Sequence, residues 1–176
     1  LNPVFTCGFQ VMESLQRHLK LKDAEARKRA VELFEKVRLP DPETCLNKYP
    51  HQLSGGQRQR VMIAMAMSCQ PALLLCDEPT TALDPSVSQT ILELIKDLKQ
   101  ETGMGVLFIT HDLALVEGFA DKVIVLYKGR ALEQGPAQEL LTEPAHPYTR
   151  GLLNCRPHLH QKRERLPMVS DYWQIG

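Results

Sequence analysis

The change of rhythm that follows Pro71 constrains the fold of this chain more than any other feature. Short apolar runs stand at residues 72–76, 105–109 and 123–127, and a helical pattern separates the first two. Alternation of this kind is typical of strand–helix–strand units with parallel strands. The third run leads through a Lys-Gly turn into a further run that ends at residue 134, which predicts a hairpin closing the sheet. We therefore expect an α/β fold.

Two amphipathic helices are predicted before this region. Between residues 9 and 39, apolar side chains recur at steps of three and four. Asp23 is expected to cap the second helix, because aspartate accepts hydrogen bonds from free backbone N–H groups. Two ion pairs with four-residue spacing are expected on its exposed face: Glu25 with Arg29, and Glu32 with Lys36.

A further helix is predicted to begin at Pro85 and to join the first apolar run to the second. Asp84 is placed to cap it, and proline is favoured at the first helical position because an N–H there has no helical partner. Val87, Ile91 and Leu94 follow at helical spacing. They are expected on its buried face.

The charge balance and the cysteine pattern exclude several classes of function. Lys plus Arg and Asp plus Glu each number 21, so there is no basic excess of the kind that binds nucleic acid or a membrane surface. The longest apolar run is far shorter than the roughly 20 residues that cross a bilayer. The five cysteines form no C-x-x-C pair, which indicates neither a disulfide framework nor a zinc site and favours a reducing cytosol.

Two adjacent glycines lie in the segment Leu53, Ser54, Gly55, Gly56 and Gln57, which we call the glycine loop. It directly precedes a predicted helix. Because glycines leave the backbone bare, exposed amide groups and the positive end of the helix dipole converge where a phosphate could bind. Ser54 and Gln57 also fit a capping box. Both interpretations stay open, although a cap alone needs no pair of glycines.

Three ionisable side chains follow the ends of predicted strands. Asp77 and Glu78 come after the first run, and His111 comes after the second. Ligands of open α/β sheets collect beyond the carboxyl ends of the strands. Asp77 is suited to holding hydrated Mg²⁺, Glu78 to polarising an attacking water, and His111 to donating a hydrogen bond to a phosphate oxygen. The alternative is that these side chains only mark where strands leave the core.

Together these segments resemble the nucleotide-binding domain of ATP-binding cassette (ABC) proteins. The glycine loop is similar to the family's LSGGQ signature, residues 73–78 to its Walker B strand, residues 82–84 to its D-loop and His111 to its switch histidine. The resemblance covers residues 1–157. It implies the C-terminal part of a P-loop NTPase fold, with a helical signature lobe and a partial, mainly parallel sheet flanked by helices.

The resemblance also implies a role for each matched position. The glycine loop would contact the γ-phosphate of an ATP held by a second, facing cassette. Asp77 would support Mg²⁺ through water, and Glu78 would act as the general base. His111 would sense the γ-phosphate, and Asp84 would couple the two sites of the dimer. The implied cofactors are ATP and Mg²⁺.

Residues 144–153 resemble the C-terminal extension of ATPase subunits that power oligopeptide, dipeptide and nickel importers. Their sequence is Pro-Ala-His-Pro-Tyr-Thr-Arg-Gly-Leu-Leu. Residues 1–4 resemble the stretch just beyond the Q-loop glutamine of that subfamily. Some of its members carry several cysteines near the extension, whereas here only Cys155 is present. An iron–sulfur cluster is therefore not expected.

Two motifs of the family are missing from the sequence. It contains neither a G-x-x-x-x-G-K-S/T phosphate loop nor a Q-loop glutamine before Leu1, and Gln10 lies inside a predicted helix. We expect an N-terminally truncated chain with little or no ATPase activity by itself. The expected parts are a helical signature lobe (1–70), a partial α/β ATPase core (71–143), the importer-type extension (144–157) and a tail or linker (158–176).

The predicted parent protein is the ATP-hydrolysing subunit of an ABC importer of peptides or nickel, peripheral to the cytoplasmic face of the membrane. Its implied partners are a second nucleotide-binding domain, transmembrane permease subunits and, indirectly, an extracytoplasmic substrate-binding protein, with no nucleic acid. Two alternatives stay open: a non-transport ABC ATPase, and a non-catalytic partner-binding fragment. The predicted helices are too short for the long coiled coils of chromosome-organising members. For this chain alone the missing phosphate loop favours the non-catalytic alternative, whereas Glu78 and His111 favour an active parent protein.

Overall fold

A computed structural model describes residues 1–81 and 83–155. The chain divides into two compact units, Leu1–Thr110 and His111–Gly176. We describe each unit by itself. Within the described residues, no helix is both long and apolar enough to span a bilayer. The four-part division expected from the sequence stays a prediction.

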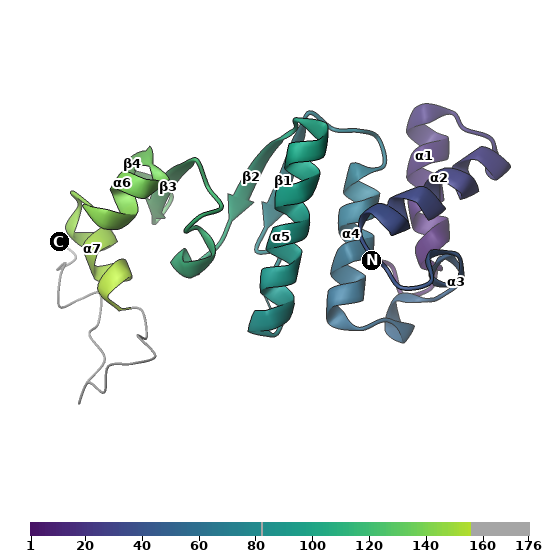
Figure 1. The fold of residues 1–176 in the computed structure, drawn as a ribbon, viewed down its shortest axis with the longest axis horizontal. Coiled ribbons are helices and arrows are strands. Elements are labelled where there is room, and N and C mark those ends of the chain that lie inside the picture. The colour runs from purple at the N-terminus through teal and green to yellow at the C-terminus, as the bar shows by residue number, and fades with distance from the viewer. Residues whose placement is uncertain (82, 156–176) are drawn as a thin grey trace. The chain divides into compact units, whose positions relative to one another are not determined.

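The first unit begins with a group of helices. They are α1 (Cys7–Leu19), α2 (Asp23–Lys36), the short α3 (Pro42–Leu46), the single 3₁₀ turn η1 (Pro50–Gln52) and α4 (Gly55–Met67) (Figure 1). Val11, Leu15, Phe34 and Val61 are completely buried where α1, α2 and α4 pack together. The two amphipathic helices predicted from the sequence are therefore confirmed, with the first beginning two residues earlier.

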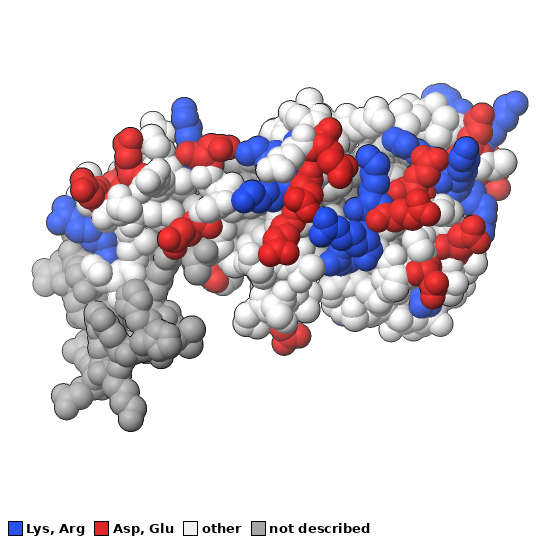
Figure 2. Space-filling model, in the orientation of Figure 1, with Lys and Arg blue, Asp and Glu red and all other residues white. Residues whose placement is uncertain are grey.

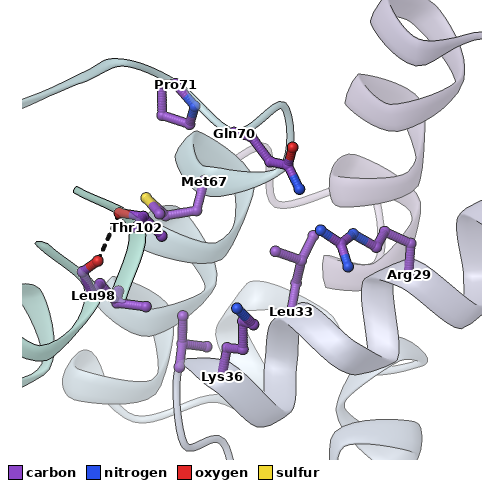
Figure 3. Close-up of a pocket in the computed structure, with 9 residues that line it drawn as sticks. Arg29, Leu33, Lys36, Met67, Gln70, Pro71, Leu98 and Thr102 are labelled. Carbon is purple, nitrogen blue, oxygen red and sulfur yellow. Dashed lines mark hydrogen bonds between the residues drawn. The ribbon is translucent and has the colours of Figure 1, made fainter. Parts of the chain in front are cut away.

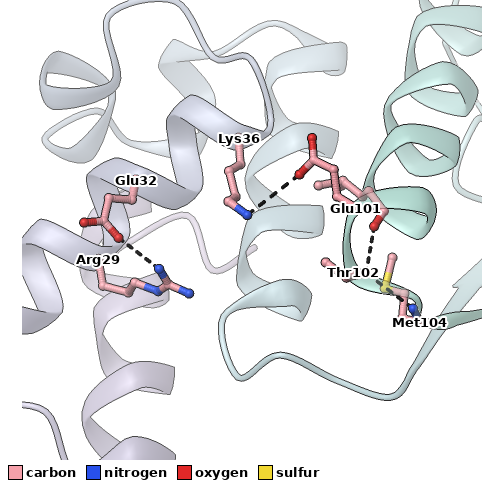
Figure 4. Close-up of polar contacts among 7 residues, drawn as sticks. Arg29, Glu32, Lys36, Glu101, Thr102 and Met104 are labelled. Atoms are coloured by element: carbon pink, nitrogen blue, oxygen red, sulfur yellow. Dashed lines mark hydrogen bonds and ion pairs between the residues drawn. The ribbon is translucent and has the colours of Figure 1, made fainter.

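Polar contacts at α2 differ from the expected ones. Lys22 occupies the N-cap position, and Asp23 is the first helical residue, so the expected Asp23 cap is wrong. Arg29 pairs with Glu32 one turn away, at 2.9 Å. Lys36 pairs instead with a residue of another helix, as Figure 4 shows. Its ammonium lies 3.8 Å from the carboxylate of Glu101 on α5 (Pro85–Thr102). Arg29 chose the partner three residues away rather than Glu25 four residues away, whereas Lys36 was missed because a neighbouring helix supplied a competing partner.

The parallel strands β1 (Leu73–Asp77) and β2 (Gly105–Ile109) flank α5 in sequence, as predicted. They pair in register, with Leu75 opposite Leu107. Successive side chains of a strand alternate between the two faces of a sheet. On one face Leu74 and Cys76 are buried, 5% and 6% exposed. The other face is apolar but open to solvent, with exposed fractions of 44% to 59% at Leu73, Leu75, Leu107 and Ile109.

The second unit is built on a hairpin. Strands β3 (Lys122–Tyr127) and β4 (Arg130–Pro136) are antiparallel, joined by Lys128 and Gly129, both with positive φ. This agrees with the predicted turn, because a type I′ hairpin turn needs positive φ at both central residues. The unit also holds the 3₁₀ turn η2 (Leu113–Leu115), α6 (Ala137–Thr142) and α7 (Pro147–Asn154). Its core comprises Val116, Val123, Val125, Ala137 and Leu140.

That the hairpin closes a single sheet stays a prediction, because the two strand pairs belong to different units. The structure gives two sheets of two strands each, β1 with β2 and β3 with β4. Sequence patterns predict strands and local turns. They do not show which other strand pairs with the free edge of a strand, because that pairing joins residues far apart in the sequence. The fold class itself, an α/β arrangement with a parallel strand pair and flanking helices, is confirmed.

Candidate functional site

The glycine loop begins α4, and its serine is the N-cap. The backbone N–H of Gln57 donates to Ser54 Oγ at 3.2 Å, and the backbone N–H of Ser54 donates to Gln57 Oε1 at 3.0 Å. The capping-box interpretation is therefore confirmed. It leaves the amides of the two glycines in the first turn, where an α-helix supplies no backbone acceptor. A phosphate could accept from these amides without breaking the cap.

The loop is anchored on both sides of the glycines. Leu53 is only 4% exposed, and the Arg58 guanidinium donates to its carbonyl oxygen at 2.7 Å. Gly55 lies against Leu83, the residue before the N-cap of α5: a Cβ on Gly55 would stand 3.1 Å from Leu83 Cδ2. The structure thus brings the glycine loop together with the turn that precedes α5.

The two predicted acids stand where β1 ends. Asp77 is the last strand residue, and both it and Glu78 are exposed. Glu78 has a φ of 44°, in the left-handed region that non-glycine residues rarely occupy. Its N–H donates to the Ile109 carbonyl at 3.0 Å, and its Oε2 accepts from the Thr81 hydroxyl at 2.9 Å. The backbone strain is thus held by neighbouring contacts, as is common at functional sites.

Two further predicted site residues lie at the boundaries of elements. Asp84 is the N-cap of α5, as predicted, although its side chain accepts no capping hydrogen bond. His111 is the first residue of the second unit and comes two positions after Ile109, the last residue of β2. The glycine loop, Asp77, Glu78 and Asp84 therefore share the first unit, whereas His111 belongs to the second.

Cys76, the residue of β1 directly before Asp77, is a buried thiol that the sequence did not single out. Burial raises its pKa to about 11, because the thiolate would lose hydration. At neutral pH it is therefore protonated and unsuited to nucleophilic chemistry. Its place in β1 makes it part of the packing beneath Asp77.

A pocket of about 280 Å³ opens between α2, α4 and α5 (Figure 3). Buried Leu33, Met67 and Leu98 supply apolar walls, while Arg29 and Lys36 reach into it from α2. The described residues that line this pocket include no member of the glycine loop and neither of the two acids at the end of β1. On the face drawn in Figure 2, acidic and basic side chains are interspersed rather than separated.

The importer-like segment after α6 is fastened to the hairpin of its own unit. Glu133 on β4 accepts from the backbone N–H groups of Ala145, at 2.7 Å, and His146, at 3.3 Å. The Arg150 guanidinium donates back to the carbonyl oxygens of Pro144 and Ala145. These bonds hold the entry to α7 in place. The predicted tail at residues 158–176, and the end of the predicted extension, lie outside the described residues.

Glu133 is electrostatically adapted to this role. Burial alone would raise its pKa, but the Thr149 hydroxyl, the two backbone N–H donors and His146 outweigh burial and lower the pKa below its ordinary value. Tyr148 packs at 5.0 Å, ring centre to ring centre, on Tyr127 of β3. The segment therefore serves at least to complete the fold of the second unit.

Several contributing residues escaped the sequence analysis. Arg58 supports the glycine loop through a hydrogen bond to a residue five positions away, and Thr81 supports Glu78, three positions away, in the same manner. Their short spacing and donor chemistry offered a local sign that could have been used. The packing of Leu83 on Gly55 spans 28 positions and left no such sign, because it depends on how α4 and α5 pack.

Two family models match separate parts of the chain. "ABC transporter" matches residues 5–81, and "Oligopeptide/dipeptide transporter, C-terminal region" matches residues 132–171. The glutathione import ATP-binding protein GsiA of Salmonella choleraesuis (strain SC-B67) is 50% identical across 97% of this chain. A putative peptide import ATP-binding protein of Brucella abortus (strain 2308) is 50% identical across 96%. The chain spans 28% of the first relative and 51% of the second.

Solved cassette structures share the fold. The dimeric ATP-binding cassette MJ0796, bound to ADP and Pi, matches with a TM-score of 0.68 at 34% identity, over 78% of this chain and 59% of that one. The cbiO1 protein of Clostridium perfringens, part of the ABC transporter complex cbiONQ, matches with a TM-score of 0.69 at 32% identity, over 79% and 54%. The chain therefore belongs to the ABC transporter family, and its C-terminal part matches the oligopeptide/dipeptide transporter C-terminal region.

Proposed function

We propose that this chain forms the signature and hydrolysis part of an ATPase subunit that powers the import of small peptides. The observation that carries the proposal is the N-terminus of α4, where Ser54 caps the helix and two bare glycine amides remain for an anion. Peptide and glutathione import are the activities named for the two relatives above. Nickel import, the other option from the sequence, has no such support.

The acids after β1 suit the chemistry of ATP hydrolysis. Glu78 would polarise the attacking water, and the Thr81 hydroxyl holds one of its carboxylate oxygens. The described residues contain no group of three metal-ligating side chains. Asp77, exposed at the end of β1, would support a hydrated Mg²⁺ through water. Bound Mg²⁺ would neutralise charge on the phosphates. We assign His111 to γ-phosphate sensing and Asp84 to coupling between sites.

A complete site would need a second cassette. The glycine loop would meet the γ-phosphate of an ATP held by the facing cassette, and MJ0796 is dimeric in its ADP-bound structure. The helical region around α1–α4 would contact permease subunits, which in turn meet a substrate-binding protein. In this arrangement the protein lies on the cytoplasmic face of the membrane. A switch between closed and open dimers would transmit the work of hydrolysis.

The test is ATP turnover by two proteins: the 176-residue chain, and an extended protein in which an upstream segment with a G-x-x-x-x-G-K-S/T loop precedes it. We expect turnover only from the extended protein, because this chain holds no phosphate loop. Glu78→Gln should lower that turnover at least a hundredfold while leaving ATP binding intact, because it removes the base and keeps the shape.

Glu93→Gln is the matched control, since Glu93 is exposed on α5, where its carboxylate accepts a hydrogen bond from Gln89. It should leave turnover unchanged. If the extended protein fails to hydrolyse ATP, the enzyme proposal is wrong, and the non-catalytic partner-binding alternative takes its place.

A further inference from the structure

The start of α5 presses directly on the second glycine of the glycine loop. A Cβ built on Gly56 would stand 2.7 Å from Val87 Cγ1. Carbon atoms in ordinary contact are about 3.5–4.0 Å apart. Helices α4 and α5 are neighbours in the first unit (Figure 1). Position 56 is therefore closed to any side chain while Val87 keeps its place.

Val87 has little freedom to move aside. It is the third residue of α5, and it is half-buried. A β-branched residue in a helix is almost confined to one χ1 rotamer. The contact at Gly55 differs, because Leu83 ends in a more adaptable side chain and its Cδ2 would be 3.1 Å away. The rigid contact is the one between Val87 and Gly56.

Val87 also lies in the first turn of α5, three residues after the N-cap Asp84. The turn from Glu78 to Asp84 leads directly into this helix, and the Thr81 N–H donates to the Glu78 carbonyl within it. A displacement of the start of α5 would therefore reach Gly56 through a hard contact, without a flexible side chain between.

We propose that Val87 is a positioning residue, which fixes the glycine loop against the turn that carries Glu78 and Asp84. The importance of this for ATP hydrolysis rests on the proposed function, whereas the contact itself does not. The inference also changes the explanation of Gly56: this residue is glycine because Val87 fills the space beside it.

The two explanations of Gly56 predict different outcomes for a paired substitution. If Val87 excludes the side chain, then Gly56→Ala damages the protein and Val87→Ala in the same chain repairs it, since shortening valine opens the space. If only close approach of the nucleotide excludes the side chain, then Val87→Ala repairs nothing. A double-mutant cycle separates these cases, because it isolates the coupling between two positions.

The first measurement is the thermal midpoint of the 176-residue chain carrying Gly56→Ala, Val87→Ala or both. We expect the double variant to melt at least 3 °C above the value obtained by adding the two single shifts. The cycle cancels the gain in helix propensity that alanine brings at position 56. The matched control is Gly135→Ala combined with Val87→Ala, because a Cβ on Gly135 meets nothing within 4 Å. Its shifts should add. An additive result for Gly56 and Val87 overturns the proposal.

The second measurement is ATP turnover by the extended protein. Gly56→Ala should lower turnover at least tenfold, and adding Val87→Ala should recover at least a third of the original rate. Loss of turnover without recovery, beside normal melting of the double variant, also overturns the positioning role. If the unsubstituted extended protein has no turnover, the proposed function fails, and the thermal cycle alone decides whether Val87 positions the loop.

Discussion

At the scale of single residues, the candidate site is held by short polar contacts that are complete without any ligand. Ser54 and Gln57 bond each other's backbone, and Thr81 holds one oxygen of Glu78. Each contact restricts a side chain that would otherwise rotate freely, and freezing such rotamers beforehand lowers the entropy cost of binding. The second unit contains a comparable arrangement, because the Glu133 carboxylate accepts hydrogen bonds from two backbone N–H groups.

The lowered pKa of Glu133 predicts a pH dependence with a definite sign. A carboxyl group with a lower pKa in the folded state stabilises that state above the unfolded pKa, and the contribution is lost as pH falls through the folded pKa. We therefore expect the protection factors of the amides at 144–154, which are exchange rates corrected for the intrinsic pH dependence of amide exchange, to be high at neutral pH and to fall below pH 4.5, the ordinary value. Glu133→Gln should lower these protection factors at neutral pH and remove this step.

Glu139→Gln is the control for that experiment, because Glu139 is an exposed glutamate on the neighbouring α6. Its exchange profile should match that of the unsubstituted chain. A pH step that survives in Glu133→Gln would show that another group fastens the segment.

At the scale of elements, the sequence predicts what local chemistry decides and misses what neighbours decide. The Ser54 cap, the Pro85 start of α5 and the Lys128-Gly129 turn are all correct, because each depends on side-chain or φ preferences within four residues. The partner of Lys36 was wrong because α5 brings Glu101 close. The Val87 contact was likewise beyond a local pattern: Val87, expected on the buried face with Ile91 and Leu94, is only half-buried, whereas the other two are buried.

The two tasks assigned to Ser54 can be separated by substitution. Ser54→Ala removes the cap and should cost about 1 kcal/mol, which lowers the melting temperature by roughly 2–4 °C in a chain of this size. Ser54→Asp keeps the cap, since aspartate is an equally good N-cap, but adds negative charge beside the proposed phosphate. It should therefore melt like the unsubstituted chain while lowering turnover of the extended protein more than tenfold. If Ser54→Ala and Ser54→Asp give the extended protein the same rate of ATP turnover, the added charge has no effect, and Ser54 serves only as the cap of the helix.

At the scale of the whole molecule, one side of the β1–β2 pair is apolar and open. Parallel sheets are normally covered on both faces, and four aliphatic side chains in solvent are unusual for a protein that stays monomeric. The related cassettes and curated relatives are all longer than this chain. The consequence for the 176-residue chain by itself is a strong tendency to associate through this face.

We expect the 176-residue chain to elute and scatter light as dimers or larger species at micromolar concentration. Replacing Leu75 and Leu107 together with glutamine should shift it toward the monomer, because these two side chains face each other in register on the open face. Met62→Gln is the control, since Met62 is also an exposed apolar residue but lies on α4. If both variants behave alike, association does not depend on the sheet face.

The alkylation rate of the buried Cys76 thiol measures local opening of β1, the strand that leads into the two acids. A thiol whose pKa is about 11 is almost entirely protonated at neutral pH, and side-chain burial also bars an alkylating reagent. Modification must therefore wait until β1 separates from its surroundings. The rate at which Cys76 is alkylated therefore reports how often β1, the strand that ends at Asp77, opens.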